Sequence, residues 1–349
     1  MSNPRATPSE RFLKVVSEYD QVLIVTHDNP DPDAIATGWA ILLLIREKLG
    51  KKVRLIGGGG IVRAENRHMV KLLDPPIELV PPMECPDHAA IVLVDCQPGN
   101  QNRLFGKEQV PVVAVIDHHP ASGRLRLPFR DVRTRAAASA SIAASYLREQ
   151  QVEPGPRLAT ATLFAIRTET RGCETHYSRL DRAILLWLTE RADPSLLAEI
   201  ESAPLTREYF ADLILALQST FVYGDVALCL LPRAAGAEIV GEVADLLIRC
   251  ESIWRVLCGA VVQGDLLLSI RTERDEDDAA ELARSTLQGL GQGGGHRHRA
   301  GGKIPGSSAG RKITEEIQDD LRNRWLDACK VDRQRGTRLV PLREIVENL

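Results

Sequence analysis

Residues 22–38, VLIVTHDNPDPDAIATG, join a short apolar run to an acidic turn and then to a segment with helical character. The run 22–26 is apolar and bounded by polar residues, which is typical of a strand buried on both faces. Residues 34–49 then predict a helix that ends at Gly50. A strand followed by a helix is the repeating unit of an α/β domain with a largely parallel sheet.

The same alternation continues through the first half of the chain. Further buried strands are predicted at 52–57, 90–95 and 112–117. Helices are predicted at 138–151, 157–167 and 179–190. We therefore expect an α/β fold whose N-terminal domain is a mostly parallel sheet with helices on both faces.

A second, smaller α/β domain is expected in the C-terminal part. It begins with a strand at 225–231 and a helix at 238–250, followed by two strands that a tight turn at Gln263-Gly264 would join. The expected divisions are 1–192 for the first domain, 193–222 for a helical linker, 223–330 for the second domain and 331–349 for a tail.

Composition and charge exclude several classes of protein. The 349 residues carry a formal net charge of −3, too little positive charge to wrap long duplex nucleic acid. Seven cysteines without a C-x-x-C pair favour reduced thiols over a disulfide framework or a zinc ribbon. The sequence has no signal peptide and no apolar run near the ~20 residues that span a bilayer. These features predict a cytoplasmic protein without a membrane partner.

Three groups of aspartates and histidines each follow a predicted strand. The groups are His27, Asp31 and Asp33, then Asp95, then Asp117, His118 and His119. Each group alone also fits a turn or a helix N-cap. Because the carboxyl ends of parallel strands share one edge of a sheet, the three groups together predict a site at that edge. Oxygen and imidazole ligands without cysteine suit Mn²⁺ or Mg²⁺, with Co²⁺ as an alternative.

In this order, H-x-x-x-D-x-D, a strand-end aspartate and D-H-H resemble the first three motifs of the DHH phosphoesterases. The late GGGH at 293–296 resembles the signature of their first-type DHH-associated C-terminal domain. The family includes oligoribonucleases (nanoRNases), 3′-phosphoadenosine 5′-phosphate phosphatases, cyclic-dinucleotide phosphodiesterases and single-strand exonucleases. The resemblance covers roughly residues 15–325 and implies a hydrolase of phosphoric ester bonds.

The resemblance also implies a role for each residue that matches a motif. Two Mn²⁺ ions would share Asp95, one held by His27, Asp31 and Asp95 and the other by Asp33, Asp95 and His118. Glu169, in AIRTETRG, stands where the family usually supplies an aspartate to the second ion. The alternative is that Glu169 is merely a charged residue of a loop.

Two further catalytic roles follow from the D-H-H motif. His119 would face the scissile phosphate as a phosphate binder or general acid. Asp117 would orient an imidazole.

The second domain is expected to bind the substrate. Successive glycines in GGGHRHRAGG (293–302) let backbone amides approach an anion, although a glycine-rich linker is the alternative. Arg271, in SIRT, stands where the family's C-terminal domain carries a substrate-contacting arginine. The predicted substrate-binding residues are Ser269, Arg271, Gly294, Gly295, His296 and Arg299.

The sequence thus predicts a metal-dependent phosphoesterase that grips very short oligonucleotides or small nucleotides across a cleft between two domains. One alternative is a pyrophosphatase or polyphosphatase of the same metal chemistry, against which GGGH argues. The other is a catalytically silent nucleotide-binding protein, which only Glu169 supports. No long duplex is an expected partner, and a homodimer is compatible with the sequence.

Overall fold

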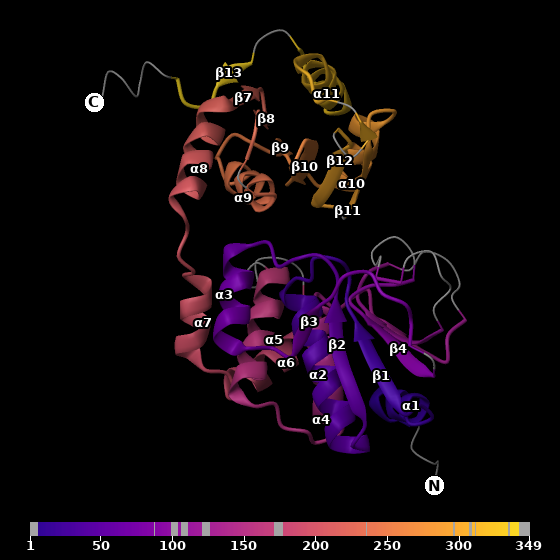
Figure 1. Ribbon diagram of the computed structural model, residues 1–349. Coiled ribbons are helices and arrows are strands. Elements are labelled where there is room, and N and C mark those ends of the chain that lie inside the picture. The colour runs from indigo at the N-terminus through magenta and orange to yellow at the C-terminus, as the bar shows by residue number, and fades with distance from the viewer. Residues whose placement is uncertain are drawn as a thin grey trace. The chain divides into compact units, whose positions relative to one another are not determined.

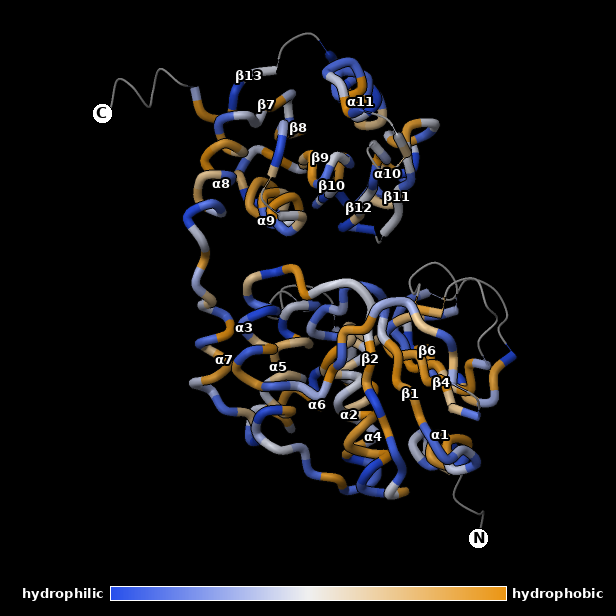
Figure 2. The backbone as a smooth tube through the Cα atoms, viewed as in Figure 1, coloured by the Kyte–Doolittle hydropathy of each residue, from blue (hydrophilic) through white to orange (hydrophobic). Residues whose placement is uncertain are grey.

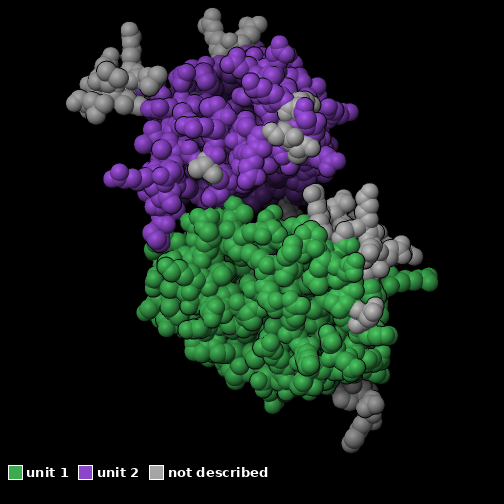
Figure 3. Space-filling view, in the orientation of Figure 1, with its two compact units in different colours: residues 1–203 green, residues 204–349 purple. Residues whose placement is uncertain are grey.

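The computed structural model describes residues 6–86, 88–98, 104–105, 111–120, 126–170, 177–234, 236–295, 297–306, 309–310, 312–333 and 336–341. The chain divides into two compact units, residues 1–203 and 204–349 (Figure 3). The segment expected as a linker contains two helices. Of these, α7 (Pro194–Glu201) belongs to the first unit and α8 (Arg207–Ser219) to the second.

A six-stranded parallel sheet forms the centre of the first unit (Figure 1). The strands are β1 (Gln21–Val25), β2 (Lys52–Gly57), β3 (Ile77–Leu79), β4 (Ala89–Val94), β5 (Val112–Asp117) and β6 (Phe129–Val132). Their order is β3-β2-β1-β4-β5-β6, so the direction of chain progression reverses between β1 and β4. In open α/β sheets, ligands bind outside the carboxyl ends of the strands at such a reversal.

The central strands β1, β4 and β5 are largely buried because their residues are apolar on both faces. All six residues of β4 are buried, and β1 is apolar in Figure 2 along its buried part. One face packs against α1 (Pro8–Val16), α2 (Pro32–Leu49) and α4 (Ser139–Glu149). Three further helices of the unit are α3 (Ala64–Leu73), α5 (Pro156–Glu169) and α6 (Arg179–Thr189).

The opposite face of the sheet differs from the expectation of helices on both sides. In the described part of the chain, this face packs against residues 80–85 and 104–105, which are not helical. Pro81, Pro82 and Pro86 lie in the connection from β3 to β4. Proline interrupts helices by removing a backbone donor, which accounts for the irregular cover.

The second unit is built on a mixed seven-stranded sheet in the order β11-β12-β10-β9-β8-β7-β13. Its elements are β7 (Thr220–Tyr223), β8 (Val226–Leu231), α9 (Glu238–Leu247), β9 (Arg255–Val262), β10 (Asp265–Thr272), α10 (Ala279–Leu287), β11 (Gln292–Gly295), β12 (Arg299–Ile304), α11 (Glu315–Ala328) and β13 (Thr337–Arg338). The predicted turn is confirmed, because Gln263 and Gly264 both have positive φ, 51° and 84°, between antiparallel β9 and β10. The α/β class of both units is therefore confirmed.

The glycine-rich segment forms strands rather than the expected anion-binding nest. Gly293 and Gly294 of β11 pair with Gly302 and Gly301 of β12. A Cβ atom at Gly293 or Gly302 would lie 2.7 or 2.2 Å from Leu287 Cδ1. These glycines therefore let α10 pack directly on the two strands.

None of the helices among the described residues is long and apolar enough to cross a membrane. The six cysteines in this part of the chain form no disulfide.

Candidate metal centre

The polar residues that follow three strands lie together at one edge of the parallel sheet. β1, β4 and β5 are consecutive in the sheet, and all three run in the same direction. Their carboxyl ends are therefore neighbours, and the loops after them bring His27, Asp95 and His118 into one cluster. The cluster lies where the strand order reverses.

Asp95 lies at the centre of this cluster, with an imidazole beside each oxygen of its carboxylate. Its Oδ2 lies 3.5 Å from His27 Nε2, and its Oδ1 lies 3.6 Å from His118 Nε2. The residue is only 2% exposed and adopts a left-handed backbone conformation, with φ of 55°. Such a conformation is uncommon for a residue other than glycine and is concentrated at functional sites.

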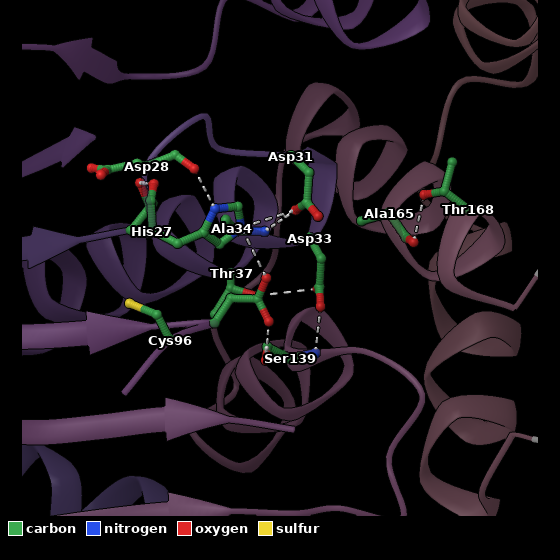
Figure 4. A network of polar contacts seen from close by, with 12 residues as sticks. His27, Asp28, Asp31, Asp33, Ala34, Thr37, Cys96, Ser139, Ala165 and Thr168 are labelled. Atoms are coloured by element: carbon green, nitrogen blue, oxygen red, sulfur yellow. Dashed lines mark hydrogen bonds and ion pairs between the residues drawn. The ribbon is translucent and has the colours of Figure 1, made fainter. Parts of the chain in front are cut away.

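His27 is oriented by the backbone of its own loop. Its Nδ1 lies 2.9 Å from the carbonyl oxygen of Asp28, so a proton on Nδ1 is donated there. Nε2 then faces Asp31 Oδ1, 3.8 Å away (Figure 4), and also Asp95 Oδ2. A backbone carbonyl that fixes the tautomer in this way is typical of metal-binding histidines.

Asp31 and Asp33 are positioned by the start of α2. Asp31 is the N-cap of this helix, and its Oδ1 accepts the N–H of Ala34 at 3.0 Å. Asp33 is buried in the first turn, where its carboxylate accepts the backbone N–H groups of Ser139 at 2.8 Å and Ala140 at 2.7 Å (Figure 4). These donors belong to the N-terminus of α4, which favours a negative charge. Asp33 Oδ2 also lies 3.7 Å from His118 Nε2.

Ser139 is a residue of the site that sequence reasoning missed. Its hydroxyl donates to Asp95 Oδ1 at 2.8 Å, while its backbone N–H donates to Asp33. One residue thus fixes two carboxylates from the same helix start. Its one signal in the sequence is a serine at the beginning of a predicted helix, which is too common to identify a site.

The two histidines of the D-H-H motif have different partners. His118 Nε2 faces Asp33 and Asp95, whereas His119 Nδ1 lies 2.9 Å from Asp117 Oδ1. Asp117 is fully buried, and its second oxygen accepts from Gln97 Nε2 at 2.6 Å. The imidazole that Asp117 orients is therefore that of His119. Gln97 was also missed, because an isolated glutamine after a strand gives no signal in the sequence.

Two carboxylates of the cluster, those of Asp33 and Glu169, have raised pKa values. Burial, followed by the charges of Asp31 and Asp95, raises the pKa of Glu169 at the end of α5 to about 8. Burial and the charges of Asp95, Glu169 and Asp31 likewise raise the pKa of Asp33. Burial opposes a proton on His27, but its bonds to Asp31 and Asp95 outweigh that effect and raise the pKa of His27 to about 11. A site with this much negative charge fits a divalent cation.

The donor atoms also have the spacing that a cation requires. Ligand atoms lie within 4.8 Å of one another in two groups of described residues, His27 with Asp31 and Asp95, and Asp95 with His118 and His119. The first group is the set expected for one ion. In the second group His119 replaces Asp33. Both groups contain Asp95.

The residues predicted to bind substrate in the second unit are differently arranged. Arg271 is 6% exposed, and its guanidinium donates to Asp245 Oδ1 at 2.6 Å and to Ser269 Oγ at 2.7 Å. Arg299 pairs with Arg271 across β10 and β12, and its Nη2 lies 3.9 Å from Asp245 Oδ1. Gly294 is open, since a Cβ there would meet no atom within 4 Å.

Gly295 and His296 also belong to the predicted substrate-binding residues. Gly295 lies in β11 at φ of 153°, where a Cβ would meet Arg299 O at 2.4 Å. His296 lies outside the described residues. Asp245, on α9, had no signal in the sequence.

Residues 21–166 match the family model described as "DHH family, N-terminal domain". This segment is therefore similar to the N-terminal domain of the DHH family, and we refer to the first unit, which contains it, as the DHH domain. The metal centre of the DHH domain comprises the residues that follow β1, β4 and β5.

A relative and two solved structures extend this comparison. The chain is 30% identical over 304 residues to the uncharacterized protein MJ1633 of Methanocaldococcus jannaschii, covering 84% of this chain and 62% of that relative. An exopolyphosphatase-related protein of Bacteroides fragilis superposes with a TM-score of 0.71 at 15% identity, over 92% of this chain and 96% of that one. RecJ of Thermus thermophilus, in complex with Mn²⁺, gives 0.54 at 17% identity, over 95% of this chain and 56% of that one. Both structures share the fold of this chain.

Proposed function

We propose that this chain is a metal-dependent hydrolase of phosphoric esters that acts on very short oligonucleotides or small nucleotides. The observation that carries the proposal is the position of Asp95, whose two carboxylate oxygens face His27 and His118 separately. A single carboxylate between two imidazoles suits a pair of divalent ions that share it, as in two-metal phosphoryl-transfer sites. The DHH-domain match and the Mn²⁺ in the RecJ structure support the same chemistry.

Two ions fit the residues of the centre. His27, Asp31 and Asp95 would hold the first, and Asp95 and His118 would hold the second with Asp33 and Glu169 nearby. Mn²⁺ is the expected ion, with Mg²⁺ or Co²⁺ as alternatives. When bound, such ions polarise phosphoryl oxygens and lower the pKa of a bound water.

His119 would hold the proton that the reaction needs. Burial opposes a proton on this imidazole, but its bond to Asp117 and the charge of Asp95 raise the pKa of His119. With one proton on Nδ1 donated to Asp117, the opposite nitrogen, Nε2, would donate a proton to the leaving oxygen of the ester. Asp117 acts here by holding the imidazole in that orientation.

The second unit would bind the substrate's phosphate or base. Its candidate cation is Arg299, which is 34% exposed, whereas Arg271 is held by Asp245 and Ser269. Gly294 and Gly301 have no side chain that would cover the backbone beside these arginines. Because Asp245 already pairs with the guanidinium of Arg271, an anionic ligand would have to displace Asp245 in order to bind Arg271.

A substrate panel tests the proposal. The full chain with Mn²⁺ would be assayed on dinucleotides, longer oligonucleotides, cyclic di-AMP, 3′-phosphoadenosine 5′-phosphate, pyrophosphate and polyphosphate. We expect the highest kcat/KM on oligonucleotides of two to about four residues or on the small nucleotide, and loss of activity with chelator. Preference for pyrophosphate or polyphosphate would contradict the proposed substrate, and inactivity on every member would favour a regulatory protein.

A further inference from the structure

A cavity of the first unit is lined by arginines and lies outside the metal centre. Its volume is about 600 Å³, and we call it the arginine pocket. The pocket is lined by Arg133, Arg135, Ala136, Tyr177, Ser178, Arg179 and Leu180. Nothing in the proposed chemistry at Asp95 uses these residues.

The charge of the arginine pocket is positive. Arg133 is neutralised, because it makes a two-point contact with Asp131 at 2.9 and 2.7 Å. Arg135 and Arg179 are exposed, and neither side chain has a hydrogen-bond or ion-pair partner in the part of the chain that the structure describes. None of the lining residues is acidic, so the pocket suits an anion.

The pocket also has an aromatic wall. Tyr177 is half-buried, and the guanidinium of Arg182 lies 5.4 Å from the centroid of its ring. Leu180 and Ala136 add apolar surface beside it. Arginines next to an aromatic ring bind single-stranded nucleotides, because the cations contact phosphates while a base stacks on the ring.

The two walls of the pocket are joined by one carboxylate. Asp181 Oδ2 accepts the backbone N–H of Ala137 at 3.0 Å and that of Ser178 at 2.7 Å. The loop 133–138 is therefore fixed to the start of α6. Its shape does not depend on the exposed arginines.

The same loop connects the arginine pocket to the metal centre. At its beginning the N–H of Arg133 donates to the carbonyl of Asp117 at 2.9 Å, and immediately after it Ser139 binds Asp33 and Asp95. Arg135 and Ser139 are four residues apart, so their Cα atoms lie at most ~14 Å from each other. Two or three nucleotides that extend from the scissile phosphate would cover that distance.

We infer that the arginine pocket binds a nucleotide of the substrate strand beyond those that flank the scissile phosphate. Arg135 and Arg179 would contact its phosphate, and Tyr177 would stack on its base. This inference rests on the proposed function for the identity of the strand. A dinucleotide has one nucleotide on each side of the scissile phosphate and would leave the pocket empty, whereas a tetranucleotide has a further nucleotide that would enter it.

The test compares oligonucleotide lengths in an Arg135→Ala/Arg179→Ala double variant. We expect kcat/KM to rise from two to four nucleotides in the unmodified chain, and to stay flat in the variant with dinucleotide hydrolysis unchanged. Arg148→Ala is the matched control, because Arg148 lies at the opposite end of α4. We expect Tyr177→Ala to reduce the rise of kcat/KM with length, because it removes the aromatic ring. Tyr177→Phe keeps the ring and should retain that rise.

A binding measurement separates this inference from the proposed activity. A fluorescent phosphorothioate tetranucleotide, titrated by anisotropy, should bind the double variant about tenfold more weakly. Its salt slope should fall by about 0.7, the value for one neutralised phosphate of a single strand. Equal binding or an unchanged length profile would overturn the inference, even if dinucleotides are hydrolysed. If the double variant loses binding of AMP but binds the tetranucleotide as the unmodified chain does, the pocket belongs to a free nucleotide and the inference is overturned as well.

Discussion

The buried charged residues of the two units differ in how their charges are compensated. In the DHH domain, Asp33, Asp95 and Glu169 place like charges close together, so burial and mutual repulsion raise the pKa of Asp33 and of Glu169. In the second unit, Arg271 is paired with Asp245 at 2.6 Å, and Arg255 is likewise paired with Asp277 at 2.5 Å. The first arrangement fits a cation from outside the chain. The second is complete within the protein, so an anionic ligand must compete for its arginines.

The largest effect is expected at Asp95. Asp95→Asn keeps the shape of the side chain and tolerates the left-handed backbone, but removes the charge that both ions would share. We expect activity to fall to background and both equivalents of Mn²⁺ to be lost, measured by calorimetric titration. Asp74→Asn is the matched control, because Asp74 is also left-handed but caps α3. Two bound ions in Asp95→Asn would show that the carboxylate is not shared.

The next effect separates the histidines of the D-H-H motif. His119→Ala should reduce turnover by ~10²–10⁴-fold while metal content stays near normal, because it removes a proton donor. His118→Ala should lose metal, since its Nε2 faces Asp33 and Asp95. Metal analysis and kcat distinguish the two variants. Loss of metal from both would place His119 among the ligands, as its distance from Asp95 Oδ1 of 3.7 Å also allows.

These residues illustrate which parts of the site the sequence could predict. His27, Asp95 and His118 each follow an apolar strand, and strand order alone brings the ends of such strands together. Ser139 and Gln97 act through hydrogen bonds to residues that lie 20 or more positions away in the sequence. Nothing in their immediate neighbours marks them, so they became visible only with the tertiary structure.

The second unit was harder to predict for a physical reason. A run of glycines fits either a loop around an anion or strands under a closely packed helix, and Leu287 selects the second. The pairing of Arg271 with Asp245 joins a strand to a helix 26 residues away. Sequence identifies such an arginine, but not the carboxylate that neutralises it.

A smaller effect tests the support of the metal centre by α4. Ser139→Ala removes the hydroxyl that donates to Asp95 while keeping the backbone N–H to Asp33. We expect Mn²⁺ affinity to fall by about 10–100-fold, as for other groups that orient metal ligands. Ser141→Ala on the same helix is the control, since Ser141 Oγ is buried and has no hydrogen-bond partner among the described residues. Equal affinities in both variants would mean that Asp95 is held well enough without Ser139.

Arg271 and Arg299, which are neighbours across β10 and β12, should have different roles, Arg299 in binding and Arg271 in stability. Arg299→Ala should raise KM by about tenfold with an unchanged melting temperature, because the side chain is partly exposed. Arg271→Ala should lower the melting temperature by several degrees, since it removes the buried guanidinium that donates to both Asp245 and Ser269. Steady-state kinetics and calorimetry on each variant provide the measurements. An increase in KM for Arg271→Ala with no loss of stability would reverse the two roles.

The smallest effect concerns Glu169 and depends on pH. Burial and the neighbouring carboxylates raise the pKa of Glu169 from 4.5 to about 8 in the folded chain without metal. The unfolded chain ionises first, so this group lowers stability progressively as the pH rises from about 4.5 to about 8, and no further above that. Glu169→Gln should therefore raise the melting temperature of chelator-treated protein at pH 8 but hardly at pH 4.5, with the exposed Glu18→Gln as control.

Adding Mn²⁺ should reverse the sign of this effect. If Glu169 contributes to the second ion, Mn²⁺ stabilises the unmodified chain more than Glu169→Gln, by mass action on the folded state. Glu169→Asp should retain most of the Mn²⁺ effect, because it keeps the charge that a cation needs and removes one methylene. The thermal shift produced by Mn²⁺ at pH 8 gives the comparison. Identical shifts in all three proteins would make Glu169 a neighbour of the centre rather than a ligand, and the unusual glutamate would then carry no metal preference.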